Sequence, residues 1–408
     1  MTSRVVILDD DPTGTQCAAG VTVALDPAPA RLAGIADRSL YVLTNTRAVT
    51  ARQAATVVAG VRGAFAGQDA RLVLRGDSTL RGHIAAEMNA LGLGQGVGLI
   101  VPAYPAAGRV TLGGVHYLDS GQVNVADTEF ARDPVFGYRA RTMAAWAREV
   151  GLPGPVIGIR LDELTAAAVR EALLTAPDGA VVVPDVRTDD DIAMIARGLT
   201  AAADRGRHLV VRCAAPLAAV LAGTPGRMLS PPARAAKRLL VVCGSHTAAA
   251  TRQLGRLADG SHPVRVLTTA AALAGDATGS LAARLNDDLD SSGLAILATE
   301  RTRQAEHGTL EHAAGVMAAL MAVVSAVADD TDAIASKGGI TSAETATTGL
   351  GGQRARVRGQ IITGVPLWDV TARDGRVIPQ AVVPGNVGDD SALVQVRAFF
   401  GRLRGGDI

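Results

Sequence analysis

The feature that most restricts the fold lies near the N-terminus, where a short apolar run ends against three carboxylates. Val5-Val6-Ile7-Leu8 is followed by Asp9-Asp10-Asp11 and then by Pro12-Thr13-Gly14. Four β-favouring residues in a row predict a strand of a parallel sheet covered on both faces, and the proline, threonine and glycine predict a tight turn. Open α/β sheets bind ligands at the carboxyl ends of their strands, so the aspartates are candidates for a binding site.

Three adjacent acids repel one another and raise each other's pKa values. A fold keeps them together only if a cation, a hydrogen-bond network or a substrate offsets the repulsion. The alternative is an acidic turn whose aspartates cap their own backbone. This segment alone does not separate the two interpretations.

The length of 408 residues is too great for one ordinary core and predicts two domains. Proline and glycine concentrate at Thr224-Pro225-Gly226 and at Pro231-Pro232, as is typical of a linker. We therefore predict a domain over 1–224, a linker over 225–236 and a domain over 237–408.

Apolar strands alternate with helical stretches in both halves, which predicts an α/β fold of two domains, each with a mainly parallel sheet flanked by helices. The segment Val110 to Tyr138 has no helical period and contains Gly113-Gly114, which predicts a hairpin insertion. The predicted strands are Val5 to Leu8, Leu40 to Thr44, Leu72 to Leu74, Leu99 to Val101, Val156 to Ile159, Val181 to Val183, Leu209 to Val211, Leu239 to Cys243, Val264 to Leu267, Leu294 to Leu297, Ala333 to Ala335, Gln360 to Thr363 and Ala381 to Val383.

Net charge, cysteine content and hydrophobic runs restrict the expected partners and the cellular location. The formal net charge is +1, from 40 basic and 39 acidic residues, and favours neither nucleic acid nor membrane as the main partner. Three widely spaced cysteines form no disulfide framework or CxxC motif, and the N-terminus lacks the apolar core of a signal peptide, so we expect a cytoplasmic protein. The Ala-rich run Ala313 to Ala328 is shorter than the roughly 20 residues that span a bilayer and predicts a buried core helix.

Three glycine-centred turns in the second half follow predicted strands and precede predicted helices. They are Gly244-Ser245, Ser336-Lys337-Gly338-Gly339-Ile340-Thr341 and Pro384-Gly385-Asn386-Val387-Gly388-Asp389-Asp390. Helix N-terminal amides and close backbone approach suit phosphate, so three such turns in one domain indicate a nucleotide site. Neither GxxxxGK[ST] nor a GxGxxG after the first strand of either half is present. Asp389 and Asp390 could hold Mg²⁺ through water or cap the last helix.

Together these motifs resemble the four-carbon acid sugar kinase family. The resemblance is carried, in order along the chain, by Asp10-Asp11-Pro12-Thr13-Gly14, Asp77-Ser78-Thr79-Leu80-Arg81-Gly82, Gly244-Ser245, Gly338-Gly339-Ile340-Thr341 and Gly385-Asn386-Val387-Gly388. It implies an acid-sugar-binding N-terminal domain, an ATP-binding C-terminal domain, and phosphorylation of compounds such as threonate, erythronate or 3-oxo-tetronate. It also implies that the first two motifs face the substrate, while Ser245, Gly338 to Thr341 and Gly385 to Gly388 face ATP.

The sequence departs from the family pattern at four places. Asp9 precedes the acidic pair, Thr15-Gln16 follows the glycine, and Arg75 stands where lysine is usual before DSTLRG. These changes leave the identity of the sugar acid open. Ile340 stands where an acid is common, and Glu344 lies one helical turn later.

Phosphoryl transfer needs positioning, charge neutralisation and a group that takes the hydroxyl proton. Asp11 is the first candidate for that group and Asp10 the second, with ATP and Mg²⁺ as cofactors. A guanidinium matches two carboxylate oxygens, so Arg75, Arg81 and Arg109 are candidates for the acid end of the substrate. The remaining candidates for substrate binding are Asp9, Thr13, Gly14, Asp77 and Ser78.

Other polar residues allow more than one interpretation. Asp77 holds either Arg81, a sugar hydroxyl or its own loop, and Lys337 either touches a phosphate or is solvated. His307, Glu311 and His312 have metal-ligand residue types, although a solvated helix face is the more common outcome. His83 and His116 could approach the substrate, although a structural role is the more common outcome.

Two other classes of function remain open: a two-domain protein that binds a sugar acid or nucleotide without transfer, and a lyase or epimerase of the same acids that needs no ATP. The expected partners are a small sugar acid and ATP, and a homodimer is left open. The stereochemistry and the hydroxyl that is phosphorylated are not specified by the sequence.

Overall fold

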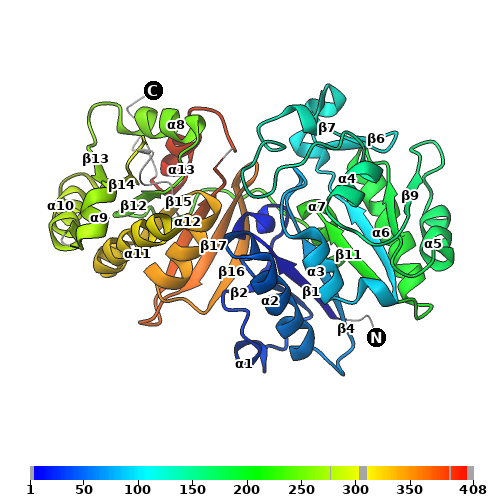
Figure 1. Cartoon of the computed structure of the whole chain (residues 1–408). Coiled ribbons are helices and arrows are strands. Elements are labelled where there is room, and N and C mark those ends of the chain that lie inside the picture. Colours follow the sequence, from blue (N-terminus) through cyan, green and yellow to red (C-terminus); the bar gives the residue numbers. More distant parts are fainter. Residues whose placement is uncertain (1–3, 276, 303–309, 386, 402–408) are drawn as a thin grey trace. The chain divides into compact units, whose positions relative to one another are not determined.

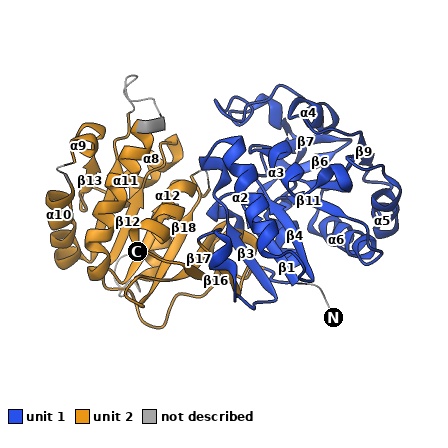
Figure 2. Cartoon of the chain, turned by 60° about the horizontal axis from the view of Figure 1, so that its bottom comes forward, with its two compact units in different colours: residues 1–14, 26–225 blue, residues 15–25, 226–408 orange. Residues whose placement is uncertain are grey.

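The computed structural model describes residues 4–275, 277–302, 310–385 and 387–401. The chain forms two compact units, one of residues 1–14 and 26–225 and one of residues 15–25 and 226–408 (Figure 2). The predicted division places all of 1–224 in the first domain, whereas residues 15–25 belong to the second unit. The chain therefore leaves the first unit directly after Gly14, returns at Asp26, and leaves again after Pro225.

Seven parallel strands form the sheet of the first unit, in the order β3-β1-β4-β11-β5-β10-β9 (Figure 1). The strands are β1 (Arg4–Asp9), β3 (Ser39–Leu43), β4 (Ala70–Arg75), β5 (Val97–Val101), β9 (Val156–Ile159), β10 (Val181–Pro184) and β11 (Leu209–Cys213). Every strand predicted in this half is present. Val6, Ile7 and Leu8 of the predicted first strand are buried, as expected for a strand covered on both faces.

Helices flank this sheet, and threonines begin most of the longer ones. The Thr50 and Thr188 side chains each form a capping box with the third helical residue of α2 and α6, respectively. The helices of the unit are α1 (Pro29–Leu32), α2 (Ala51–Ala64), α3 (Ile84–Ala90), α4 (Met143–Glu149), α5 (Ala166–Thr175), α6 (Asp189–Ala203) and α7 (Ala215–Ala222).

The hairpin insertion is also present. It forms a separate antiparallel sheet of β6 (Val110–Leu112), β7 (Val115–Leu118) and β8 (Val123–Asn124). We use the name insertion for residues 110–138.

The sheet of the second unit has the order β13-β14-β12-β15-β18-β17-β16-β2. Pairing is parallel from β13 to β18 and antiparallel from β18 to β2. The strands are β2 (Val21–Ala24), β12 (Leu239–Cys243), β13 (Val264–Leu267), β14 (Leu294–Thr299), β15 (Ala333–Lys337), β16 (Arg354–Ile362), β17 (Val365–Thr371) and β18 (Val377–Val383). The predicted α/β class with two sheets flanked by helices is confirmed.

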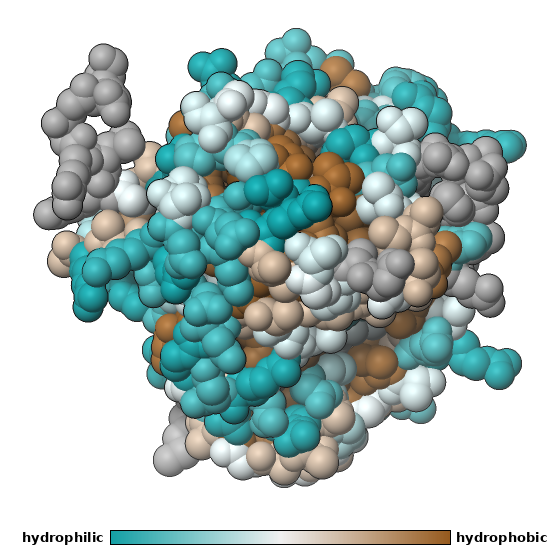
Figure 3. Space-filling model, turned by 90° about the vertical axis from the view of Figure 1, so that its left-hand side faces the viewer, coloured by the Kyte–Doolittle hydropathy of each residue, from teal (hydrophilic) through white to brown (hydrophobic). Residues whose placement is uncertain are grey.

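The helices of this unit are α8 (Ala248–Ala258), α9 (Thr269–Ala274), α10 (Ala277–Ser292), α11 (Leu310–Val327), α12 (Gly339–Glu344) and α13 (Ala392–Phe400). A core of aliphatic side chains from β12, β14, β15 and β18 packs against α8 and α13. On the side where β13, α9 and α10 lie, hydrophilic residues cover much of the surface, with smaller hydrophobic areas between them (Figure 3).

The predicted buried core helix at Ala313 to Ala328 is only partly buried. Met321, Val323 and Val324 are buried, whereas Ala318 and Ala322 are exposed. The segment His312–Asp330 is the one stretch among the described helices that is long and apolar enough to cross a membrane, and one such helix is weak evidence for a span.

Candidate functional site

The acidic turn lies at the carboxyl edge of the first sheet. Asp9 is the last residue of β1 and pairs with Leu43 on one side and Arg75 on the other. Its carbonyl accepts hydrogen bonds from the amide and the hydroxyl of Thr44, both at 2.9 Å. Backbone pairing to both neighbouring strands therefore fixes the point at which the acidic turn begins.

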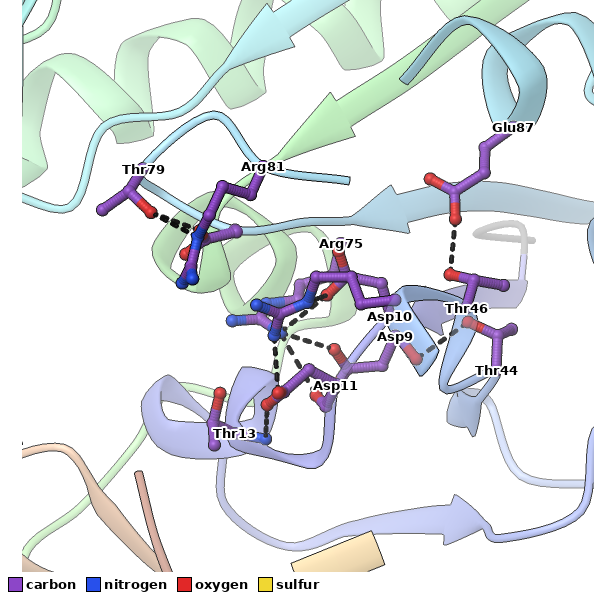
Figure 4. Close-up of polar contacts among 12 residues, drawn as sticks. Asp9, Asp10, Asp11, Thr13, Thr44, Thr46, Arg75, Thr79, Arg81 and Glu87 are labelled. Carbon is purple, nitrogen blue, oxygen red and sulfur yellow. Dashed lines mark hydrogen bonds and ion pairs between the residues drawn. The ribbon is translucent and has the colours of Figure 1, made fainter. Parts of the chain in front are cut away.

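A hydrogen-bond and ion-pair network with arginines offsets the repulsion between the acids (Figure 4). Arg75 Nη1 donates to Asp9 Oδ1 at 3.0 Å, to Asp10 Oδ1 at 3.2 Å and to the Asp11 carbonyl at 3.1 Å. Arg47 lies 2.6 Å from Asp11 Oδ2 and 3.4 Å from Asp10 Oδ1. The three carboxylates are thus held together by Arg75 at the end of β4 and Arg47 in the turn that follows β3, as the first interpretation of this turn requires.

A second layer of charge lies beside Asp10. Arg212 Nη2 is 3.5 Å from Asp10 Oδ2, and Arg212 also pairs with Glu87. The hydroxyl of Thr46 donates to Glu87 at 2.5 Å. Arg212 and Glu87 are both buried, so this layer stabilises the base of the site and is not open to a ligand.

The three aspartates are not equivalent. Burial raises the pKa of Asp9 to about 7 although Arg75 opposes this, and burial also raises the pKa of Asp10. Burial acts in the same direction on Asp11, but Arg47, Arg75 and the amide of Thr13 outweigh it and lower the Asp11 pKa. The Asp11 side chain keeps 14% of its surface exposed, against 1% for Asp9 and 3% for Asp10. Asp11 is therefore the ionised acid of this turn that a ligand can reach.

Gly14 is required by close packing at the end of the turn. A Cβ atom at this position would lie 2.2 Å from Asp9 Oδ1 and 2.4 Å from Arg75 Cδ. Any side chain would therefore displace the ion pair beneath it. Thr13 is nearly buried, and its amide donates to Asp11 Oδ1 at 2.7 Å, which is the Asx-type contact of the alternative interpretation.

The DSTLRG loop folds around Asp77. Arg81 Nε donates to Asp77 Oδ2 at 2.7 Å, and the Thr79 hydroxyl donates to the same oxygen. Burial acts to raise the pKa of Asp77, but Arg81 and Arg47 hold it below its ordinary value. Leu80 adopts a left-handed conformation with φ of 68°, which is uncommon for a leucine and shows how tightly the loop turns.

The three candidate arginines for the substrate carboxylate have different partners. Arg75 is buried and pairs with the acidic turn, and Arg81 pairs with Asp77 and lies 3.4 Å from Asp133. Arg109 donates to the Ser78 hydroxyl at 2.5 Å and forms no ion pair with any described carboxylate. Burial lowers the pKa of Arg109 more than Asp77 raises it. Arg109 therefore keeps the most capacity for an added anion.

His83 and His116 are structural in their contacts, as expected. His83 lies 2.8 Å from the Val49 carbonyl and edge-on to Phe136. His116 is 1% exposed and lies between the Ser78 carbonyl at 2.8 Å and the Thr111 hydroxyl at 3.0 Å.

His116 gives a prediction for the pH dependence of stability. Burial lowers its pKa from 6.5 to about 4, so between these pH values the unfolded chain binds a proton that the folded chain does not. The free energy of unfolding should fall as pH drops from 6.5 to 4, by up to about 3 kcal/mol from this residue alone, and the full contribution returns above pH 6.5. Chemical denaturation of wild type and His116→Gln at pH 7 and 4.5 measures this. An equal loss in both proteins would show that other groups cause the acid sensitivity.

The three glycine turns of the second unit converge, as their positions at adjacent strand ends predict. A Cβ atom on Gly244 would lie 2.3 Å from the Thr341 hydroxyl, and one on Gly385 would lie 3.0 Å from the Ser245 hydroxyl. Gly338 has a φ of 112° and its Cβ would lie 3.3 Å from Ser245 Cβ. Bare backbone from all three turns therefore meets around Ser245.

Two buried side chains, Lys337 and Gln253, hold the glycine turn after β18 in place. Lys337 is fully buried and donates to the Pro384 carbonyl at 2.7 Å, and burial lowers its pKa to about 8. Gln253 Nε2 donates to the carbonyls of Val387, Gly388 and Asp389 at 3.2, 3.2 and 2.8 Å. The Lys337 amine is thus occupied by the turn, in contrast to the solvated or phosphate-bound lysine expected from sequence.

The remaining candidates of the second half differ in their environment. Ile340 is 46% exposed, Thr341 is buried, and Gly339 begins α12. Glu344 accepts a hydrogen bond from the Thr348 hydroxyl at 2.7 Å. Asn386, His307 and the Glu311 side chain lie outside the described residues.

The two acids proposed for Mg²⁺ have structural partners. Asp389 Oδ1 accepts from the Ser391 amide at 2.9 Å and its hydroxyl at 2.6 Å, and Asp390 pairs with Arg252 at 2.8 Å. No group of three or more metal-ligating side chains occurs within the described ranges. Mg²⁺ bound to a nucleotide takes most of its ligands from phosphates and water, so a preformed cage is not required.

Replacement of Gly244 should affect nucleotide binding specifically. The added methyl of Gly244→Ala would overlap the Thr341 hydroxyl, and overpacking of this kind costs about 1 to 3 kcal/mol. We expect affinity for ATP to fall by about 5- to 150-fold in a calorimetric titration. The matched control is Gly255→Ala, where the added atom has no neighbour within 4 Å. Equal affinity in both variants would contradict a role for the first turn.

Three site residues were not named by the sequence analysis. Arg47, Arg212 and Glu87 complete the charge network, and Arg47 contacts both Asp10 and Asp11. The loop Thr44-Asn45-Thr46-Arg47 follows a predicted strand and was expected at the same sheet edge as the aspartates, although no role was given to Arg47. Arg212 lies inside β11 and Glu87 inside α3, where no motif marks them.

The chain matches two family models that together cover most of its length. One is described as a sugar-binding N-terminal domain and matches residues 5–221, and the other as a nucleotide-binding C-terminal domain and matches residues 240–393.

Curated relatives and solved structures agree with these matches. A D-threonate kinase of Bordetella bronchiseptica is 34% identical over 224 residues, 53% of this chain and 50% of that protein. A D-erythronate kinase of Heliobacterium modesticaldum is 31% identical over 274 residues, 62% of this chain and 60% of that protein. The matches thus span about half to three-fifths of these relatives.

Two crystal structures share the fold. A protein of Salmonella typhimurium LT2 aligns with a TM-score of 0.75 at 20% identity, over 98% of this chain and 100% of that chain. A Haemophilus influenzae protein aligns with a TM-score of 0.68 at 18% identity, over 97% of this chain and 100% of that chain. With both family domains matched in order along the sequence, the chain belongs to the four-carbon acid sugar kinase family.

Proposed function

We propose that this protein is an ATP-dependent kinase that phosphorylates a hydroxyl of a four-carbon sugar acid such as threonate, erythronate or 3-oxo-tetronate. The observation that supports this most is the acidic turn, where one carboxylate is ionised and accessible while its two neighbours are buried with arginines. The kinases named among the relatives act on acids of this size.

In this mechanism Asp11 orients the attacking hydroxyl and takes its proton. The transition state of phosphoryl transfer is loose, so the proton leaves late and orientation matters more than basicity. A carboxylate with a lowered pKa can therefore serve, because Arg47 and the Thr13 amide fix its direction. Asp9 and Asp10 support the turn from below.

The acid end of the substrate is assigned to Arg109 and the DSTLRG loop. Arg109 is held by the Ser78 hydroxyl and has no carboxylate partner among the described residues. Arg81, which the sequence analysis also proposed, is assigned to bracing of Asp77.

The nucleotide is assigned to the three glycine turns of the second unit. Their bare backbones meet around Ser245, and the N-terminus of α12 adds its amide dipoles. Mg²⁺ would enter with the phosphates and neutralise charge that develops during transfer.

Formation of ADP that depends on the sugar acid tests the proposal. Purified protein with ATP and Mg²⁺ should release ADP in the presence of one or more of D-threonate, L-threonate, D-erythronate and 3-oxo-tetronate, and little without them. Binding of acid and ATP without ADP release would favour the non-catalytic binding protein. Conversion of the acid without ATP would favour the lyase or epimerase.

A further inference from the structure

The insertion contacts the DSTLRG loop through the backbone as well as through side chains. His116 Nε2 lies 2.8 Å from the Ser78 carbonyl, and the Tyr138 hydroxyl donates to the Thr79 carbonyl at 3.0 Å. These are consecutive peptide groups of the loop. Both carbonyls are therefore held toward the insertion.

The protonation state of His116 determines which partner donates in its hydrogen bond with Ser78. With its pKa lowered to about 4 by burial, the ring is neutral at physiological pH. Because a carbonyl can only accept, the ring must carry its proton on Nε2 and donate it to Ser78. The Thr111 hydroxyl can then donate to Nδ1 at 3.0 Å and fixes this tautomer.

Side chains of the insertion also hold the end of the loop. Arg81 lies 3.4 Å from Asp133, and its guanidinium carbon is 5.0 Å from the centre of the Phe130 ring. His83 packs edge-on against Phe136, with ring centres 4.9 Å apart.

The insertion is itself fixed to the parallel sheet. Thr111 and Val186 exchange two backbone hydrogen bonds of 2.9 and 2.8 Å just beyond β10. Asp185, which is buried, accepts from the amides of Gly113 and Gly114 at 2.7 and 2.9 Å. The insertion therefore connects the end of β10 rigidly to the loop that follows β4.

This arrangement sets the direction of the loop's donors. In a trans peptide the N–H points opposite to the C=O, and the described residues contain no cis peptide. With the Ser78 and Thr79 carbonyls bound to the insertion, the amides of Thr79 and Leu80 point away from it. The Leu80 amide closes the turn onto the Asp77 carbonyl at 3.2 Å, and Thr79 is fully buried. The Ser78 hydroxyl, which accepts from Arg109, is thus the part of the loop that links these contacts to the candidate carboxylate site.

We propose that the insertion is the element that shapes the sugar-acid loop, with His116 and Tyr138 as positioning residues that hold Ser78, and through its hydroxyl Arg109, in place for the acid. This inference rests on the proposed function for the identity of the ligand. It adds that affinity for the acid depends on two hydrogen-bond donors of the insertion, the His116 ring and the Tyr138 hydroxyl, which are remote from the acidic turn. The expected effect is on acid binding and not on ATP binding.

Two substitutions separate positioning from simple folding. Tyr138→Phe removes only the hydroxyl and should weaken threonate or erythronate binding by about 2- to 10-fold, the range of one neutral hydrogen bond. His116→Leu leaves the buried Ser78 carbonyl without a donor and should weaken binding of the acid by about 5- to 150-fold. His116→Gln can still donate through its amide and should restore most of the affinity.

Calorimetric titration with each acid in the absence of ATP, and with ATP alone, gives both affinities without catalysis. The matched control is Tyr117→Phe in β7, which makes the same chemical change on a tyrosine without a hydrogen bond to the loop. Weakened acid binding with unchanged ATP binding, restored in His116→Gln, supports the proposal. Equal weakening of both ligands, or no change in either positioning variant, would overturn it.

Hydrogen exchange of the loop amides provides a measurement that does not depend on the substrate. Exchange over residues 77–83 should be faster in Tyr138→Phe and His116→Leu than in wild type and Tyr117→Phe. Faster exchange in a protein that binds no sugar acid would refute the proposed function and retain the insertion's role in holding the loop. Unchanged exchange would refute that role whatever the ligand is.

Discussion

Replacement of Asp11 by asparagine should lower kcat by about 10² to 10⁴, because the amide loses the ion pair with Arg47 that directs the side chain and cannot accept the hydroxyl proton. Asparagine keeps the size of the side chain and can keep its acceptor for the Thr13 amide, now at 2.7 Å. Affinity for ATP should change little, since the glycine turns belong to the other unit. Steady-state ADP formation at saturating sugar acid, with a separate ATP titration, measures both quantities.

The matched control is Asp162→Asn, which removes an exposed carboxylate 3.4 Å from Arg160. Exposed ion pairs of this kind contribute about 0 to 1 kcal/mol, so this variant should behave as wild type. Near-normal turnover of Asp11→Asn would contradict the assignment and would mean that Asp11 only shapes the turn. Asp10 would then be the next acid to test.

The sequence predicted the framework of the fold because the information was local. Runs such as Val5 to Leu8 and Leu239 to Cys243 have the length and composition of buried parallel strands, and both are strands within one residue or so of the predicted ends. Parallel strands of an α/β sheet all end at the same edge, so the loops that follow neighbouring strands could be expected to lie close together there.

Other features depend on contacts between distant residues. Residues 15–25 contain β2, which pairs with β16 more than 300 positions later, and the Thr15 hydroxyl accepts from Trp368 at 2.8 Å. A prediction that divides the chain only at its linker cannot reveal that this early segment belongs to the second unit. The β16–β17 hairpin turns at Gly364, which the sequence analysis included in no turn, so β17 was missed.

The roles of the arginines also required the structure. Arg81 and Arg109 are equally suited to a carboxylate by residue type. Only the contacts show that Arg81 is paired with Asp77 and Asp133, whereas Arg109 is held by a neutral hydroxyl. A partly buried guanidinium without a carboxylate partner is costly, and an anionic ligand would offset that cost.

Replacement of Arg109 by glutamine should therefore lower kcat/KM for the sugar acid by about 10² to 10⁴. This range corresponds to the loss of two charge-assisted hydrogen bonds, each worth about 1.5 to 3 kcal/mol. Arg109→Lys keeps the charge but loses the planar fork, so its loss should be about 10- to 150-fold. Steady-state kinetics with threonate or erythronate, compared with the corresponding neutral amide, measures recognition of the carboxylate.

Wild type should discriminate strongly against the neutral amide, and Arg109→Gln should largely lose this discrimination because both ligands then lack the same contact. The matched control is Arg132→Gln, an exposed arginine of the insertion, which should leave discrimination unchanged. If Arg109→Gln lowers kcat/KM equally for the acid and the amide, Arg109 only supports Ser78 and the loop. In that case Arg81→Lys should be tested in the same assay, because Arg81 is also partly exposed and pairs with Asp77.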